Sequence, residues 1–158
     1  MKKLICLLFL FGTVAFAKTG YEGYWMMDDG KFIIKIEKTK QEEYVGHVVW
    51  LKNLYYPKGD KMEGIEQYDR NNPDKNLRVK SRKVMGLQIV GELYEKNGKL
   101  KDGWVYDSWN GKLYHGSAKL VDEDHLKLRG SFDKIGIFGI SQKAERVKDL
   151  KKYNLKEF

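Results

Sequence analysis

Apolar and polar residues alternate in short runs along most of the chain. In residues 31–37, Phe32, Ile34 and Ile36 fall on one face, whereas Lys35 and Glu37 fall on the other. This period of two is typical of a half-buried β-strand. Comparable runs occupy residues 22–27, 44–51, 84–90 with an extension over 92–95, 103–107, 112–121, 125–132 and 135–147. No segment before residue 148 has the 3.6-residue period of an amphipathic helix.

Turn residues separate these runs at close spacing. Gly30 follows two aspartates, and Asn97-Gly98 and Asn110-Gly111 lie between apolar runs. Asp-Gly and Asn-Gly favour tight hairpins of type I′, which need positive φ. Seven to ten short antiparallel strands in meander order predict an all-β, up-and-down β-barrel, because pairing the first strand with the last removes the exposed sheet edges. We expect this barrel domain over residues 18–147, followed by a lysine-rich tail or short helix over 148–158.

The first seventeen residues have the pattern of a cleaved signal peptide. Lys2 and Lys3 precede an apolar run over residues 4–11, and Ala15-Phe16-Ala17 forms a small-x-small cleavage site, the three parts of a secretory signal. We therefore expect residues 1–17 to direct export to the periplasm or outside the cell. Cys6 lies inside this segment, so the mature chain is predicted to contain neither a disulfide nor a reactive thiol.

The mature chain carries a modest positive charge. Residues 18–158 contain 28 basic and 22 acidic residues, a net charge of +6. The lysines are scattered between apolar positions, which indicates a solvated strand face, with binding to an anionic membrane surface or an acidic glycan as the alternative. Nucleic acid is not expected as a partner, because export removes the protein from it.

One stretch departs from the alternating pattern. The connection over residues 52–82 is unusually long for a compact domain, and such loops are often lids or binding loops. Its centre concentrates amides, carboxylates and guanidinium groups in the candidate ligand-binding residues Asp69, Asn71, Asn72, Asp74, Arg78 and Arg82.

This polar stretch has two interpretations. In the first, its arginines offer bidentate donors to the carboxylate or phosphate of a ligand head group. In the second, the stretch satisfies itself: Asn and Asp cap backbone groups, Pro73 restricts φ, and Arg78 pairs with Asp69 or Asp74 to hold the loop onto the barrel.

A set of aromatic and flexible apolar residues predicts the interior of the barrel. If the barrel is hollow, these residues line a cavity for an acyl chain or a flat apolar molecule; if it is filled, they form its core. They are Trp50, Met85, Tyr106, Tyr114 and Phe138.

The sequence offers no signature of catalysis or of metal binding. His47, His115 and His125 lack the spacing and the accompanying cysteines of a zinc site. The adjacent Asp28 and Asp29 are expected in a turn and not as a hydrolase pair. No nucleophile elbow or phosphate-binding glycine loop is present. We therefore expect no metal, no cofactor and no enzymatic activity.

Several motifs resemble a known family. Gly23 and Trp25 near the mature N-terminus, with Arg146 on the last strand, resemble the lipocalin arrangement in which an arginine packs across a tryptophan at the closed end. A more specific series runs through 46–51, 69–78, 86–89, 103–114, 126–130 and 137–139. It is similar to a family of exported bacterial proteins catalogued as a domain of unknown function, with lipocalin-like members, and covers residues 20–147.

The resemblance implies a calycin-type barrel with an internal cavity and an unassigned ligand. Two positions depart from the family pattern: Ala144 replaces an aromatic residue, and Ser108 replaces a proline. We expect an exported protein that sequesters or carries a small hydrophobic or amphipathic molecule, such as a fatty acid. The alternative is an exported interaction protein, an inhibitor or host-facing factor, with a filled barrel.

Overall fold

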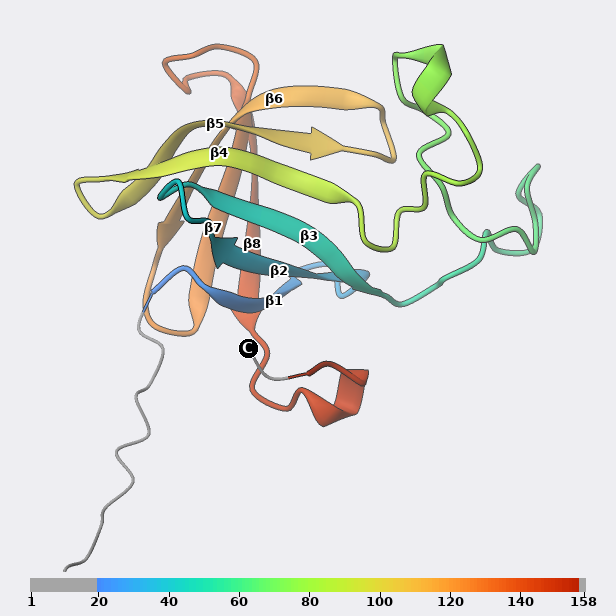
Figure 1. Ribbon diagram of the computed structural model, residues 1–158, viewed down its shortest axis with the longest axis horizontal. Coiled ribbons are helices and arrows are strands. Elements are labelled where there is room, and N and C mark those ends of the chain that lie inside the picture. The colour runs from blue at the N-terminus through green and yellow to red at the C-terminus, as the bar shows by residue number, and fades with distance from the viewer. Residues whose placement is uncertain (1–19, 157–158) are drawn as a thin grey trace, which may run out of the picture.

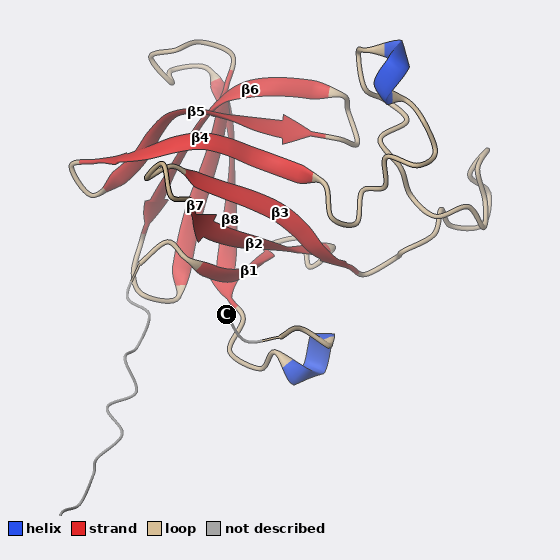
Figure 2. Cartoon of the chain, viewed as in Figure 1, coloured by secondary structure: helices blue, strands red, loops and turns tan. Residues whose placement is uncertain are grey.

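The computed structural model describes residues 20–156, which form an eight-stranded antiparallel barrel (Figures 1 and 2). The strands follow one another around the barrel in chain order, as predicted. They are β1 (Gly23–Met27), β2 (Phe32–Lys38), β3 (Tyr44–Leu51), β4 (Gln88–Lys96), β5 (Lys99–Asp107), β6 (Lys112–Leu120), β7 (His125–Ser131) and β8 (Gly139–Arg146). Short 3₁₀ helices, η1 (Lys75–Leu77) and η2 (Lys151–Tyr153), are the helical turns of the described chain. The predicted signal peptide lies outside the described residues.

Pairing of the first and last strands closes the barrel. Trp25 lies opposite Arg146 and Met27 lies opposite Ala144, both antiparallel. Because every strand then has two neighbours, none presents an unpaired edge. The all-β, up-and-down barrel inferred from the alternating pattern is confirmed.

Two strands begin later than the pattern predicts. The run from Val84 was expected to be strand, but β4 begins at Gln88, since Gly86 adopts φ 86° and the amide of Leu87 donates to the carbonyl of Val84 in a turn. The last strand was expected from Ile135, but β8 begins at Gly139. In both places a local turn replaces the predicted strand, because Gly86 and Gly136 adopt positive φ and the amide of Gly136 donates to the carbonyl of Asp133.

The hairpin turns differ in type. Asn97 and Gly98 have φ of 53° and 71°, as a type I′ turn requires. At Asn110-Gly111 only the glycine has positive φ, and the Asp107 carboxylate accepts hydrogen bonds from the amides of Trp109 and Asn110. The type I′ prediction for this second turn is therefore wrong: the aspartate organises a longer turn.

The half of the barrel at which β1 begins is filled by side chains. Its inward side chains are almost completely inaccessible to solvent and pack into one cluster, which includes Trp25, Ile34, Ile36, Val48, Leu93, Leu100 and Leu126. We call this the closed end. The other end carries the β1–β2, β5–β6 and β7–β8 turns and the connection of residues 52–87; we call it the open end. In Figure 1 this connection, in green, extends past the ends of β3 and β4.

The C-terminal tail covers part of the outer wall. The ring of Tyr153 in η2 lies 5.1 Å from the ring of Trp50 on β3, and the Tyr24 hydroxyl donates to the carbonyl of Lys156 at 2.8 Å. In Figure 1 the tail, in red, lies beside β1 and β2. Among residues 20–156 no helix is long and apolar enough to cross a membrane.

Candidate functional site: a cavity at the open end and the connection above it

A cavity of about 340 Å³ occupies the open end of the barrel. Its wall is mainly apolar and is built from seven of the eight strands, all except β3, with the β1–β2 and β5–β6 turns. The apolar lining consists of Met27, Phe32, Ile89, Val105, Tyr106, Trp109, Tyr114, Leu128 and Ile140. The wall forms because alternate residues of each strand point inward, and the side chains near this end do not meet across the barrel as they do at the closed end.

Polar side chains mark the mouth of the cavity. The Asp29 carboxylate accepts a hydrogen bond from the Lys31 amide at 3.0 Å and lies 3.3 Å from the Lys31 ammonium. Asp107 is engaged by the turn that it caps. The exposed Lys31 ammonium and the Gln142 amide are therefore the lining donors that a ligand head group could reach.

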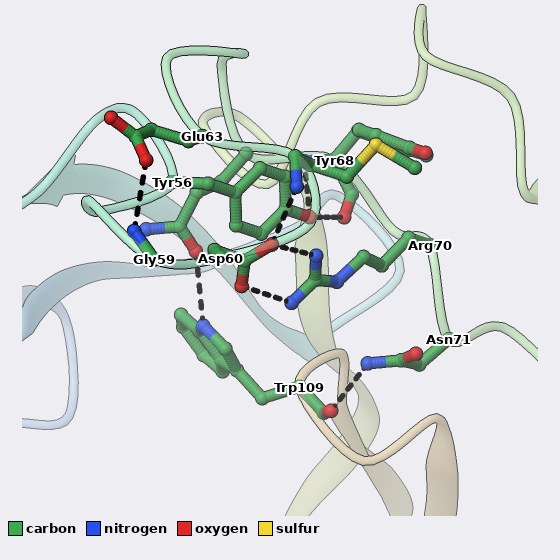
Figure 3. A network of polar contacts seen from close by, with 10 residues as sticks. Tyr56, Gly59, Asp60, Glu63, Tyr68, Arg70, Asn71 and Trp109 are labelled. Atoms are coloured by element: carbon green, nitrogen blue, oxygen red, sulfur yellow. Dashed lines mark hydrogen bonds and ion pairs between the residues drawn. The ribbon is translucent and has the colours of Figure 1, made fainter.

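The long connection beside the mouth has its own fold (Figure 3). Asp60 and Arg70 form two parallel hydrogen bonds of 2.6 and 2.8 Å, and the Arg70 guanidinium lies 4.0 Å from the centre of the Tyr56 ring. The Tyr56 hydroxyl donates to the carbonyl of Tyr68 at 2.9 Å. The hydrogen bonds from Arg70 lower the pKa of Asp60 to about 2. Bidentate pairing of this kind holds a loop in one geometry.

Trp109 attaches this connection to the cavity mouth. Its indole Nε1–H donates to Oε1 of Gln67 at 3.2 Å, and its carbonyl accepts from the Asn71 side chain at 2.7 Å. Figure 3 shows Asn71 and Trp109 facing each other. The Trp109 ring also lies 5.0 Å from the ring of Phe32, which lines the cavity. The connection and the mouth therefore form one structural unit.

Asp69 is the centre of the polar stretch singled out in the sequence. Its carboxylate is fully buried and accepts hydrogen bonds from the Tyr106 hydroxyl at 2.6 Å, the Asn72 amide at 2.7 Å and Arg82 Nε at 2.9 Å. Burial and the bond to Asp69 raise the pKa of Tyr106. A buried carboxylate needs such partners, and here they tie the connection to β5.

The remaining polar residues of the stretch act locally. Asp74 caps η1 by accepting from the amide of Asn76. Arg78 donates to the carbonyl oxygens of Asn72 and Pro73. The expected pairing of Arg78 with Asp69 or Asp74 is therefore corrected: Arg82 forms the ion pair with Asp69. The polar groups of this stretch therefore bind one another and the barrel, as the second interpretation predicted, and do not form a binding site for a ligand head group.

A second hollow of about 290 Å³ lies along the connection and β5. It is bordered by Asn72, Arg82, Trp104 and Leu113. Its cationic lining group, Arg82, is already paired with the buried Asp69, and the Gln88 side chain donates to the carbonyl of Val90.

The aromatic candidates divide into two groups. Tyr106 and Tyr114 line the cavity. Trp50 lies against Tyr153 on the outer wall, the half-buried Met85 packs against the core from the connection, and Phe138 is exposed on the β7–β8 loop. The expectation that these three residues line the cavity is corrected, because a turn or a strand bulge places each outside it.

Several lining residues were not among the sequence candidates. Met27, Ile89 and Val105 line the cavity, as do Phe32 and Leu128, whose inward direction follows from the alternation. They could have been predicted from the sequence by selecting the inward-facing residues of each strand that lie closest to the open-end turns.

At the closed end, Arg146 lies across Trp25. Its guanidinium is 4.2 Å from the centre of the indole and donates to the carbonyl oxygens of Gly20, Glu22 and Glu123 at 2.7–2.9 Å. Burial lowers the pKa of Arg146. Gly23 allows this approach, because a Cβ there would lie 2.6 Å from Nη1 of Arg146. Charge-assisted bonds and the cation–π contact together close this end.

Among the described residues, no group of three or more histidine, cysteine or acidic side chains is arranged to hold a metal ion. His125 instead contacts Asp122 at 2.7 Å, next to it at the β6–β7 turn.

Comparisons with known proteins agree with this geometry. A family model described as an uncharacterized protein conserved in bacteria (DUF2147) matches residues 23–146. A solved Helicobacter pylori protein, HP1028, described as belonging to the lipocalin family, is similar in structure with a TM-score of 0.69. It is 21% identical, and the match covers 87% of this chain and 90% of that chain, which supports the fold alone. No curated protein matches the chain.

Proposed function

The chain belongs to the bacterial family DUF2147, and from this premise we propose that it is an exported binding protein that sequesters or carries a small hydrophobic or amphipathic molecule. Export is proposed from the signal-peptide pattern of residues 1–17. The lipocalin-like barrel is consistent with binding of a small ligand in general.

The observation that carries the proposal is the contrast between the two ends of the barrel. The closed end is packed with large side chains, whereas the open end leaves about 340 Å³ behind a mainly apolar wall. Concave, largely apolar sites with a few polar groups are the usual form of small-molecule sites, and about 300 Å³ is their lower size limit. The interaction-protein alternative with a filled barrel is therefore less favoured.

The volume of the cavity and the polar groups of its lining suggest the class of ligand. A volume near the lower limit fits a short acyl chain or a compact apolar body better than a whole long-chain lipid. The Lys31 ammonium at the mouth, and the Gln142 amide opposite Leu128 on the wall, suit a carboxylate or another small polar head. We therefore propose a fatty-acid-like molecule with its apolar part among the apolar lining residues and its head near Lys31.

Titration with a short-chain fluorescent fatty acid tests the proposal. We expect saturable binding at micromolar concentration. Val105→Phe should weaken it about tenfold or more by occupying the cavity, because overpacking removes the space for ligand atoms. The control is Val121→Phe, which places the same side chain at an exposed position of the closed end and should bind as the unchanged protein does.

Native mass spectrometry of protein purified from its own host, without detergent, would identify a retained ligand. A lack of saturable binding in the titration, or equal binding by the Val105→Phe variant, would contradict carriage in this cavity. In that case the interaction-protein alternative would be preferred.

A further inference from the structure

The β7–β8 loop and the start of β8 present a cluster of large apolar side chains to solvent. Phe132, Ile135, Ile137, Phe138 and Ile140, here named the apolar loop, are between 58% and 84% exposed. They lie within nine consecutive residues at the open end. Single exposed apolar residues are normal, but contiguous exposed groups mark sites of interaction.

Two charged side chains, Asp133 of the loop and Arg129 of β7, hold the loop in this conformation. The Asp133 carboxylate accepts from the amides of Ile137 and Phe138 at 3.1 and 2.7 Å. Arg129 donates to the carbonyl oxygens of Gly136 and Ile137 at 2.8–3.1 Å. Backbone groups of the loop bind the Asp133 carboxylate and the Arg129 guanidinium. In the projecting segment, residues 134–138, Lys134 is therefore the one charged side chain.

The apolar loop is continuous with the cavity mouth. Ile140 lines the cavity, and the Phe132 ring lies 5.1 Å from the ring of Tyr114, another lining residue. A molecule that leaves a surface contacted by this loop would reach the cavity along apolar side chains.

A row of lysines crosses the outer wall of the same strands. Lys119 lies opposite Lys127, and Lys127 lies opposite Lys143. Their neighbours Ala118, Leu126 and Ala144 are buried in the core, so the lysines point outward. Within residues 20–156 none of the three ammonium groups has an ion-pair partner. Like charges directly opposite one another destabilise a sheet, so this basic row suits an anionic partner.

We propose that the apolar loop and the basic row form one docking surface for an anionic lipid bilayer, with the cavity mouth at the edge of this surface. The apolar tips enter the interface, and the lysines meet the anionic head groups. This docking goes beyond the proposed ligand binding and does not depend on it.

The dimensions and the chemistry favour a bilayer over a protein partner. The basic row lies about four residues, or roughly 13 Å, from the base of the loop. If the outer wall of β6–β8 lies against the bilayer, both the basic row and the apolar loop contact it. Apolar segments insert into such a surface by about 5–10 Å. The projecting tips of Ile135, Ile137 and Phe138 offer no hydrogen bonds, and a bilayer requires none. The net charge of +6 complements anionic head groups.

Vesicle flotation of the purified protein, without added fatty acid, tests the docking. We expect binding to vesicles of phosphatidylglycerol mixed with phosphatidylcholine, and much weaker binding to phosphatidylcholine alone. Ile135→Ser/Phe138→Ser should reduce binding about tenfold or more, because two apolar insertions are lost. Lys127→Gln/Lys143→Gln should reduce binding to the anionic vesicles about fivefold per lysine.

Matched controls at other positions separate docking from general surface effects. Tyr94→Ser removes an exposed apolar side chain of β4 near the closed end, and Lys40→Gln/Lys101→Gln removes exposed charges elsewhere. Both controls should float as the unchanged protein does, and melting temperatures should show that all variants fold.

Three results would overturn the proposal: no flotation with anionic vesicles, equal loss in the closed-end control, or self-association that Ile135→Ser/Phe138→Ser abolishes in the absence of vesicles. The last would make the loop a contact between copies of the chain. Flotation without any fatty-acid titration signal would support docking while removing the proposed ligand function, so the two failures are distinguishable.

Discussion

The hydroxyl of Tyr106 on β5 donates a 2.6 Å hydrogen bond to the fully buried carboxylate of Asp69, which lies 37 residues earlier in the chain. This bond joins the barrel wall to the connection that stands beside the cavity mouth. Because Asp69 also accepts from Asn72 and Arg82, removing one donor leaves the carboxylate with part of its desolvation cost uncompensated.

Tyr106→Phe should therefore lower the free energy of unfolding by about 1–3 kcal/mol, the usual cost of leaving a buried polar group short of a partner. Urea unfolding measures this change, and hydrogen exchange should increase mainly in residues 52–87. Tyr94→Phe, which alters an exposed tyrosine, is the control and should change stability by less than about 0.5 kcal/mol. Equal stabilities of the two variants would disprove the role given to this bond.

Arg146→Ala should destabilise the barrel by about 2–4 kcal/mol, since it removes three hydrogen bonds from a charged group and uncovers Trp25. Tryptophan fluorescence during urea unfolding reports it directly. Arg78→Ala is the matched control: this exposed arginine bonds only to carbonyl oxygens of its own loop among the described residues, and about 1 kcal/mol or less is expected. A loss at Arg78 as large as that at Arg146 would contradict the assignment of Arg146 as the closing residue.

Ser108→Ala should stabilise the protein by up to about 1 kcal/mol. The Ser108 hydroxyl is buried and has no hydrogen-bond partner among the described residues, so its removal ends a desolvation cost. Ser131→Ala is the matched control, because the equally buried Ser131 hydroxyl donates to the carbonyl of Asp133 at 2.8 Å, and its loss should be destabilising. Thermal unfolding of the two variants should give shifts of opposite sign; shifts of the same sign would refute the difference.

The pairing of Asp60 with Arg70 should make the connection sensitive to acid. The pKa of Asp60 is lowered from 3.8 to about 2, so the pair stabilises the folded connection above about pH 4 and this contribution is lost as the pH falls toward 2. Arg70→Gln should return the pKa of Asp60 toward 3.8, measured by NMR titration of the carboxyl carbon.

Asp133 provides the internal control for this titration. Its pKa is lowered by the amides of Phe138 and Ile137, at the β7–β8 loop, and should stay lowered in the Arg70→Gln variant. An Asp60 pKa that does not respond to this substitution would show that another group causes its shift.

Much of the barrel is predictable from local pattern. The alternation in residues 32–36 and 125–131 places Ile34, Ile36 and Leu128 inward, and the glycine-containing turns mark where the strands reverse. Closure follows from the meander order, since an exposed edge is costly. Turn type was less predictable, because the side chain of Asp107 decides the β5–β6 turn.

The sequence by itself determined the barrel, the inward faces of most strands and the importance of the polar stretch around Asp69. Only the tertiary structure decided that Arg82 and Tyr106 bind this carboxylate, that the tail covers Trp50, and that Phe138 projects into solvent. The physical reason is that side-chain period specifies which residues share a face. What covers that face, or which distant donor reaches a buried charge, depends on segments that meet only when the chain has folded.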